Sequence, residues 1–306
     1  MLKNKSILAN CIRWLTPYGI IMWHRQKIAE KKERVFLEKK KMIKEYFLNL
    51  NYSEQESEVV EVIDYLKRYN FSVFPYPFAR NYHKSDIDVL YDQSNKTRYV
   101  IHQNKRLYFP ANWSKEQVQT CYNELSIEQD NNSPHRYETE EFSVEEGEVI
   151  ADIGAAEGIW ALDHIEKASK VYLFECDPLW IDALHKTFAP WSEKVVIVNK
   201  CVSDRCGEKC ITLDHFFEGR AIHFIKADIE GMELQLIQGG KTIFQRDEPL
   251  KIVLCTYHQE GDAANVKEFL EKNRFTTQFS KGYMLFIYDP NLREPYLRRG
   301  LIRAKK

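Results

Sequence analysis

Five short apolar runs that alternate with helical segments constrain the fold of this chain more than any other sequence feature. Each run is continuous, which is typical of strands covered by helices on both faces. Alternation of strands and helices indicates an open, mostly parallel sheet with right-handed crossovers. The predicted strands are Val149–Ile153, Val171–Glu175, Val195–Val198, Phe224–Asp228 and Ile252–Tyr257.

Helices and a closing hairpin complete this predicted α/β domain, to which we assign residues 128–291. The segments Thr276–Phe279 and Tyr283–Tyr288 flank a Ser-Lys-Gly turn, which predicts a hairpin at the end of the sheet. Apolar residues at helical spacing predict covering helices at Trp160–Lys167, Leu179–Phe188, Glu233–Gln238 and Ala263–Asn273.

Residues 1–127 lack this alternation, and we expect them to form an α+β addition. Apolar positions predict a short amphipathic helix over 7–15, which ends at the Pro-Tyr-Gly sequence of 17–19. A long polar helix is expected over Lys27–Leu50, and another helix with one buried face around 59–66. Further along, Tyr99–His102 and Arg106–Phe109 predict a hairpin, and a capping box at 114–117 begins a further helix.

The net charge of −1 conceals two basic ends and an acidic body. Residues 1–50 carry twelve Lys and Arg against four Asp and Glu, and residues 292–306 carry six against one. We expect 292–306 to be a basic tail. Basic ends indicate contact with an anionic partner such as the inner face of a membrane, although two solvated segments would show the same composition. Because the body is acidic, nucleic acid is not an expected partner.

The compartment is indicated by what the sequence lacks. Polar residues and a proline interrupt the apolar run that starts at Ile7, and no window supplies the apolar length of a spanning helix. Seven cysteines, an odd number in a long chain, fit a reducing compartment, so we expect a cytoplasmic location. Cys201, Cys206 and Cys210 lie close in sequence but lack an obvious fourth ligand, and we expect no structural metal there.

A glycine turn follows the first predicted strand and leads directly into a helix. Glycine lets the backbone turn sharply and approach a ligand closely. About 20 residues later the next strand ends at Glu175, where a carboxylate can accept both hydroxyls of a ribose. This spacing predicts a nucleoside bound across two strand ends, although the glycines can also serve only a tight turn.

The acids of this turn distinguish two kinds of nucleoside. A dinucleotide turn offers bare amides to a pyrophosphate, and the carboxylates of Asp152 and Glu157 would repel that group. Ala156 also stands where the pattern G-x-G-x-x-G needs its second glycine. Because the acids suit a ligand with an ammonium and a sulfonium, we predict S-adenosylmethionine (SAM) as the cofactor. The expected cofactor residues here are Asp152, Gly154, Ala155, Glu157 and Gly158.

Two further strand ends carry groups that suit methyl transfer to a hydroxyl. One gives Asp228 and Glu230, and the other gives His258. The transfer requires alignment of the acceptor and is helped by a base that takes the hydroxyl proton. We expect these three residues to be catalytic. Asp228 can instead cap a helix, His258 can simply pack, and a divalent ion among them is an unsupported alternative.

The polar segment Glu128–Tyr137 precedes the first strand of the domain, and its turn formers predict a loop. This loop either folds over the pocket as a lid or is a plain linker. As a lid it would bring His135 and Tyr137 to the substrate.

Several of these stretches resemble the FkbM-type family of SAM-dependent methyltransferases, and the pattern K-x-D-x-E-G at 226–231 is the most specific. The resemblance implies a class I methyltransferase (Rossmann-like) fold with a seven-stranded sheet and an antiparallel final strand. It implies that Cys176 and Val202 line an adenine pocket. The stretches are VIADIGAAEGIWAL (149–162), VYLFECDP (171–178), NKCVSD (199–204), ITLD (211–214), IKADIEGMELQLIQGG (225–240) and CTYH (255–258).

The resemblance also implies an activity, the methylation of hydroxyl groups on sugars or other natural products. We therefore expect a SAM-dependent O-methyltransferase acting on a sugar or glycan during polysaccharide biosynthesis. A methyltransferase for a small non-sugar metabolite and a SAM-binding module without turnover are the alternatives. The acceptor is inferred by family association rather than from residues.

Overall fold

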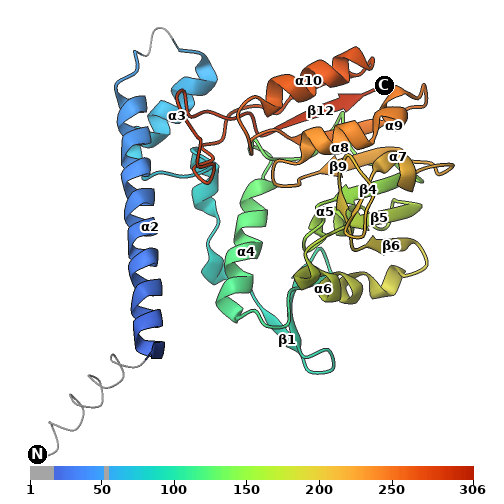
Figure 1. Ribbon diagram of the computed structural model, residues 1–306, viewed down its shortest axis with the longest axis horizontal. Helices are drawn as coiled ribbons and strands as arrows, with labels where there is room; N and C mark the ends of the chain where they lie inside the picture. The colour runs from blue at the N-terminus through green and yellow to red at the C-terminus, as the bar shows by residue number, and fades with distance from the viewer. Residues whose placement is uncertain (1–16, 52–54) are drawn as a thin grey trace, which may run out of the picture.

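A seven-stranded sheet forms the centre of the protein, described here over residues 17–51 and 55–306 of a computed structural model (Figure 1). The strand order is β11-β12-β10-β9-β4-β5-β6, and β12 is antiparallel to both neighbours. This order confirms the expected class I methyltransferase architecture. The strands are β4 (Val149–Ile153), β5 (Lys170–Phe174), β6 (Val195–Val198), β9 (Phe224–Ala227), β10 (Lys251–Cys255), β11 (Thr276–Phe279) and β12 (Leu301–Lys305).

The predicted closing hairpin is wrong in its second strand. The partner of β11 is Leu301–Lys305, which lies between β11 and β10, and not Tyr283–Tyr288. Residues 301–304 are therefore buried, and the prediction of a basic tail over 292–306 is also wrong. Arg303 is tolerated inside because its guanidinium donates to the carbonyl oxygens of Arg136 and Tyr137.

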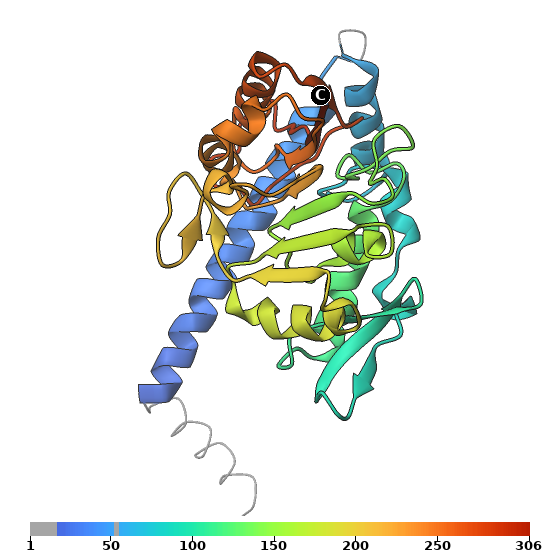
Figure 2. The ribbon, with the colours of Figure 1, turned by 90° about the vertical axis from the view of Figure 1, so that its right-hand side faces the viewer.

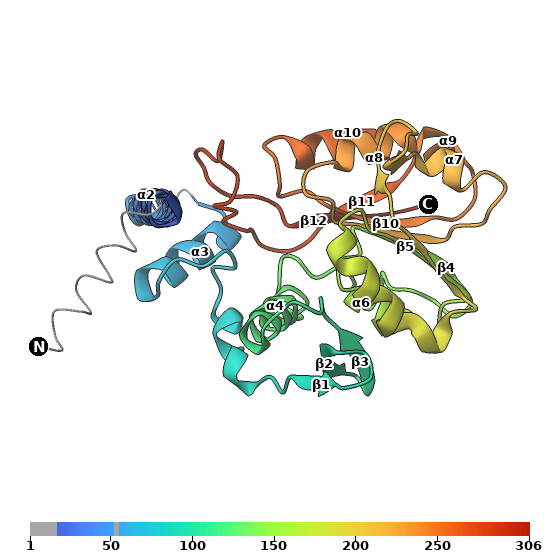
Figure 3. The ribbon, with the colours of Figure 1, turned by 60° about the horizontal axis from the view of Figure 1, so that its bottom comes forward.

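Helices cover both faces of the sheet, as Figure 3 shows. Side chains alternate between the faces, so that Ile150 joins one buried cluster and Ala151 the other. One face is covered by α5 (Ile159–His164) and α6 (Pro178–Phe188), with the short helix η4 (Ala189–Trp191) behind them. The opposite face is covered by α7 (Leu213–Phe216), α8 (Glu233–Gly239), α9 (Lys241–Gln245) and α10 (Asp262–Lys272).

The N-terminal addition packs against the α5 and α6 face (Figure 3). The predicted hairpin is confirmed and gains a third strand, and the capping box is present, with Ser114 and Gln117 bonded to each other's backbone. Its elements are α2 (Pro17–Leu48), α3 (Ser57–Arg68), η2 (Pro77–Asn81), η3 (Lys84–Asp86), β1 (Leu90–Asp92), β2 (Thr97–His102), β3 (Lys105–Tyr108) and α4 (Lys115–Glu128).

Helix α2 is a long rod along one side of the molecule (Figures 1 and 2). It has 32 residues and begins at Pro17, so the sequence at 17–19 starts this helix, where we had predicted a helix end. The helix predicted over 7–15 lies outside the described residues. None of the helices described is both long enough and apolar enough to cross a membrane.

Candidate active site

Four strand ends meet at one edge of the sheet. Strands β4, β5, β9 and β10 run parallel, and their carboxyl ends bring together Asp152, Glu175, Asp228 and His258. The chain turns from β4 to β5 on one side and reaches β9 on the other, so this edge is a topological switch point. Ligands of open α/β sheets bind at such points.

The glycine turn after β4 is shaped by close packing. Gly154 has a φ of 72°, and a Cβ on it would lie 1.9 Å from the carbonyl oxygen of Asp228. Gly158 has a φ of 79°, and its Cβ would lie 2.7 Å from the ring of Phe188 in α6. Only glycine fits either position. These two glycines therefore let β9 and α6 approach the turn, a reason that the sequence alone did not give.

Glu175 is fixed at the end of β5 by backbone donors. Its Oε2 accepts from the amide of Ala156 at 2.8 Å, and its Oε1 accepts from the amide of Asp177 at 2.7 Å. The residue is 8% exposed. A carboxylate held this way at the second strand end lies where a ribose is expected, and further acceptor capacity remains on its oxygens.

Asp152 is neutralised from within the protein. It is completely buried, and the ammonium of Lys226 lies 2.8 Å from its Oδ1 and donates to the carbonyl oxygen of Gly154 at 3.0 Å. Burial disfavours the charged amine, but the carboxylates of Asp152 and Asp228 outweigh this effect and raise the pKa of Lys226. Asp152 therefore contributes less net negative charge to the turn than we expected.

Two other acids at this end keep their protons to higher pH than free carboxyls do, and a bound cation would favour their ionised forms. Burial raises the pKa of Glu157, in the turn, to about 8, and that of Glu128, at the end of α4, to about 6. A buried carboxylate gains most from a nearby positive group. Asp152 Oδ2 has no hydrogen-bond partner among the described residues. These features fit a cationic ligand such as the methionine part of SAM.

Four side chains that carry hydrogen-bond donor groups surround Asp228. The hydroxyls of Tyr137 and Tyr257 donate to it at 3.1 and 3.3 Å. The Nε2 atoms of His135 and His258 each lie 3.4 Å from one of its oxygens. Burial alone would raise the pKa of Asp228, but the two histidines and the nearby lysine outweigh it and hold this pKa well below its usual range. Asp228 is thus an ionised carboxylate of fixed orientation.

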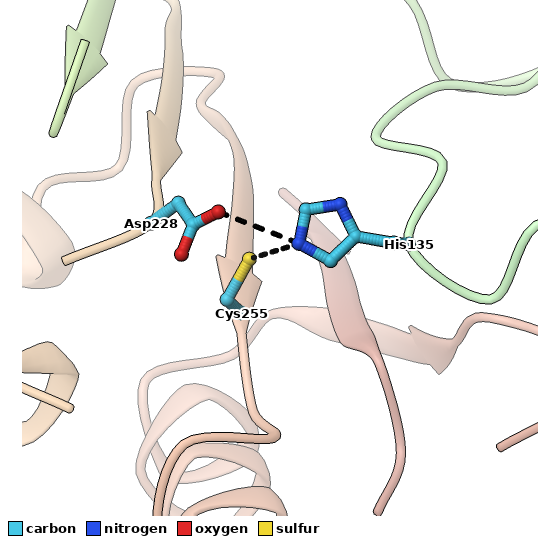
Figure 4. A group of neighbouring side chains, drawn as sticks. All are labelled: His135, Asp228 and Cys255. Carbon is cyan, nitrogen blue, oxygen red and sulfur yellow. Dashed lines mark hydrogen bonds and ion pairs between the residues drawn. The ribbon is translucent and has the colours of Figure 1, made fainter. Parts of the chain in front are cut away.

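The segment that we predicted as a lid or linker is instead an internal wall. His135 is fully buried and Tyr137 is 6% exposed. Figure 4 shows the ring of His135 directed at Asp228 and at Cys255, whose Sγ is 3.5 Å from Nε2. Because aromatic rings surround the imidazole, both side chains contact Asp228 rather than solvent. A direct substrate contact by either residue does not fit this burial.

Two groups of side chains have donor atoms within 4.8 Å of one another, a spacing that a metal ion can use. One is His135, Asp228 and Cys255, and the other is Asp228, Glu233 and His258. In each group the histidine nitrogens lie 3.1 to 3.5 Å from the other donor atoms. His135 forms a hydrogen bond with Cys255, whereas the contacts of His258 are ion-pair contacts without hydrogen-bond geometry. We assign both groups to a polar network around Asp228.

His258 and Glu230 face a cavity of about 730 Å³ beside Asp228. The His258 side chain is 4% exposed, that of Glu230 is 89% exposed, and 3.8 Å separates Nε2 from Oε2. The far wall is formed by residues 286–293, including Phe286 and Tyr288. We had predicted part of this segment as a strand, because alternating aromatic residues have the same pattern in both cases. No sequence signal identified this wall.

The remaining predicted cofactor residues are Ala155, in the turn, and the two assigned to adenine, Cys176 and Val202. Cys176 is exposed after β5, Ala155 is buried in the turn, and Val202 is buried in β7 (Cys201–Val202). A short strand, β8 (Cys210–Ile211), pairs with β7. The cofactor roles of these three residues stay predictions.

Comparisons with known proteins agree with the motif resemblance. Residues 190–278 match the family model of the methyltransferase FkbM domain. This segment contains the K-x-D-x-E-G pattern and His258. Comparison with curated proteins gives no match.

Solved structures with a similar fold include two methyltransferases by name and one protein in complex with AdoMet. The methyltransferase FkbM from Methylobacillus flagellatus KT is 14% identical, with 62% of this chain and 53% of that chain covered and a TM-score of 0.44. M. jannaschii TYW2 in complex with AdoMet is 13% identical, with 71% and 89% covered and a TM-score of 0.40. The precorrin-6y C5,15-methyltransferase from Geobacter metallireducens GS-15 is 14% identical, with 54% and 84% covered and a TM-score of 0.36. The chain thus spans about half the length of the first of these proteins.

Proposed function

We propose that this chain, whose residues 190–278 match the model of the FkbM methyltransferase domain, is a SAM-dependent O-methyltransferase that acts on a hydroxyl of a sugar or glycan. The observation that carries the proposal is the position of Asp228. It lies at the switch point of the sheet, between the acidic glycine turn and the cavity that holds Glu230 and His258. A cofactor on one side and an acceptor on the other would meet at this residue.

The cofactor side of the site would hold SAM through groups that are already oriented. Glu175 would accept from the ribose hydroxyls, and the carboxylates of Glu157 and Glu128 would lie near the methionine ammonium. When bound, SAM supplies an electrophilic methyl group on a sulfonium. Gly154 and Gly158 keep the turn tight, so the backbone amides and carbonyls can approach the ligand.

The acceptor cavity has the mixed lining that suits a sugar. Phe286 and Tyr288 offer aromatic surface, and the Tyr288 side chain is largely exposed. Gln259, Asn291 and Glu260 add amide and carboxylate groups for hydroxyl recognition. A sugar has both CH faces and many hydroxyls, whereas a small apolar metabolite would leave these polar groups unpaired. This lining favours a saccharide over the alternative of a small non-sugar metabolite.

Nucleic acid remains disfavoured for a local reason. The carboxylate of Glu230 lines the acceptor cavity and would repel a phosphate backbone. Arg293 lines the same cavity, but its guanidinium is 2.6 Å from the carboxylate of Glu260. The positive charge of that arginine is therefore already paired.

Contact with an anionic membrane is proposed only for the N-terminal end. At the other end Arg298 and Arg299 pair with Asp289 and Glu58 at 2.9 and 2.7 Å, and Lys306 donates to backbone carbonyls. These three side chains have partners within the protein, so the membrane contact proposed here does not include the C-terminal end. Salt-sensitive binding to anionic vesicles should be lost in a Lys27→Glu, Lys31→Glu, Lys32→Glu variant. Unchanged binding of this variant would exclude α2 as the contact.

The direct test of the proposed activity uses labelled SAM. We expect the purified protein to transfer label to the saccharide fraction of a lysate, and an Asp228→Asn variant to transfer far less. Label recovered only in protein, nucleic acid or small non-sugar metabolites would contradict the proposed acceptor class. No transfer to any fraction, despite SAM binding, would favour a binding module without turnover.

A further inference from the structure

Behind His258 lies an acid that the expected catalytic set does not include. Glu233 is the first residue of α8 and is completely buried. Its Oε1 accepts weakly from the amide of Ile229 at 3.3 Å and lies 3.1 Å from Nδ1 of His258, an ion-pair contact whose angles fall outside hydrogen-bond geometry. Its Oε2 has no hydrogen-bond partner among the described residues.

A carboxylate in this position requires a partner. Removing an ionised carboxylate from water is costly unless a charge or a strong donor compensates for it. The Nδ1 atom of His258 is the ring nitrogen that Glu233 faces, so a proton on Nδ1 stabilises the buried carboxylate. The opposite ring nitrogen, Nε2, then faces Asp228 and Glu230 on the side of the acceptor cavity.

We propose that Glu233 is a positioning residue, which holds Nδ1–H of His258 and thereby presents Nε2 to the acceptor hydroxyl as the general base. This inference rests on the proposed O-methyltransferase function. It assigns to one residue a role that neither the family match nor the motif resemblance gives to it. The arrangement has the logic of a base oriented by a buried acid through its second nitrogen.

The other groups around the ring determine its charge. Asp228 at the end of β9 and Glu230 after it lie 3.4 and 3.8 Å from Nε2, and Asp262 of α10 also acts on the ring. The rings of Tyr257 and Phe286 pack against it at 4.0 and 5.6 Å. Burial disfavours the imidazolium, but the surrounding acids outweigh it and raise the pKa of His258.

His258 must lose its Nε2 proton before it can act. The neutral ring then keeps its remaining proton on Nδ1, toward Glu233. During transfer the acceptor O–H bond breaks, its proton goes to Nε2, an O–CH₃ bond forms and the S–CH₃ bond breaks. The products are a methyl ether, the neutral thioether and an imidazolium held by Glu233. Atoms and charge balance without another reactant.

The first test needs neither acceptor nor turnover. Nitrogen NMR of the ¹⁵N-histidine-labelled full chain, with the His258 signals assigned by a His258→Gln variant, reports the tautomer of the neutral ring. We expect the Nδ1–H tautomer, against the usual preference of imidazole for Nε2–H. In Glu233→Gln the His258 pKa should fall by about one unit or more, because one of the acids that raise it is gone. An Nε2–H tautomer in the wild-type protein would overturn the proposal, even where the variants fail to fold.

The second test separates positioning from general structure. Glu233→Gln should lower kcat about 10- to 100-fold with KM for both substrates within about twofold, and should move the acidic limb of the pH profile to lower pH. Glu233→Asp should recover part of kcat, and exposed Glu268→Gln on α10 is the matched control. A fall in kcat without a shift of the pH profile would refute the role. If the wild-type protein methylates no saccharide, the proposed function fails while the NMR result still decides the role of Glu233.

Discussion

The cofactor end and the acceptor end of this site are built in different ways. The cofactor end consists of strand ends and one tight turn, and Gly154, Lys226 and Glu175 are held there by backbone or buried charge contacts. The acceptor end consists of irregular chain after β10 and β11, and residues 286–293 form its wall. This difference indicates that sequence variation is better tolerated at the acceptor end, because a wall formed by a loop can change without disturbing the sheet.

Within the N-terminal addition, helix α2 supports the acceptor wall, whereas α4 brings Glu128 to the cofactor end. In α2, Lys39 donates to the carbonyl oxygens of Ile287 and Asp289 at 3.2 and 2.6 Å. One turn earlier, Phe36 stacks on Tyr288 with 5.7 Å between ring centroids. These contacts join residues about 250 positions apart in sequence. We infer that α2 shapes acceptor binding and leaves the cofactor turn unaffected.

The largest expected effect is a loss of stability caused by a substitution at the cofactor end. Lys226→Met removes the cation from buried Asp152 and Asp228, which should lower the free energy of unfolding by about 3–5 kcal/mol. Urea denaturation measures this change. Lys272→Met, which breaks an exposed ion pair on α10, should cost less than about 1 kcal/mol. Equal losses in the two variants would show that Lys226 is not a buried counter-charge.

The second prediction is a loss of turnover at Asp228, which lies between the cofactor end and the acceptor end. Asp228→Asn keeps the shape of the side chain but removes its charge, so turnover should fall about 100-fold or more. SAM affinity measured by calorimetry should change by less than about fivefold, because the turn and Glu175 are untouched. Normal turnover of Asp228→Asn would refute the role of this carboxylate in the reaction.

A smaller effect is expected when the support of the acceptor wall is removed. The double variant Phe36→Ala, Lys39→Ala should raise the acceptor KM about 10-fold, since the loop loses its contacts with α2. SAM affinity should not change. Val35→Ala, at a position 53% exposed on the same helix, is the matched control. If SAM affinity fell together with acceptor affinity, the cofactor end and the acceptor end would not be structurally independent.

The last prediction concerns the pH dependence of stability. The pKa of Glu157 is raised by burial from its ordinary 4.5 to about 8 in the folded protein. Between these values the folded state keeps a proton that the unfolded state has lost, so this group makes stability fall as pH rises from about 4.5 to about 8. Glu157→Gln should flatten that decline and raise Tm at pH 8 by a few degrees. An unchanged pH dependence of Tm would show that the carboxylate is ionised throughout.

The sequence predicted the sheet better than the site. Strand ends and the glycine turn follow from local patterns, so the five central strands were placed to within two residues. The pairing of Lys226 with Asp152 was missed because 74 positions separate them and charge partners cannot be inferred from spacing. Strand β12 was missed because Arg303 and its basic neighbours resemble a solvated tail. The burial of the guanidinium depends on carbonyl acceptors that only the fold supplies.

The most direct test of the account is the choice of nucleoside at the switch point. Calorimetric titration of the purified chain should show one SAM bound per chain, affinity about 10-fold weaker in Glu175→Ala, and no binding of NAD⁺. Binding of NAD⁺ or of a flavin dinucleotide with no binding of SAM would contradict the assignment of the acidic turn to a cationic cofactor.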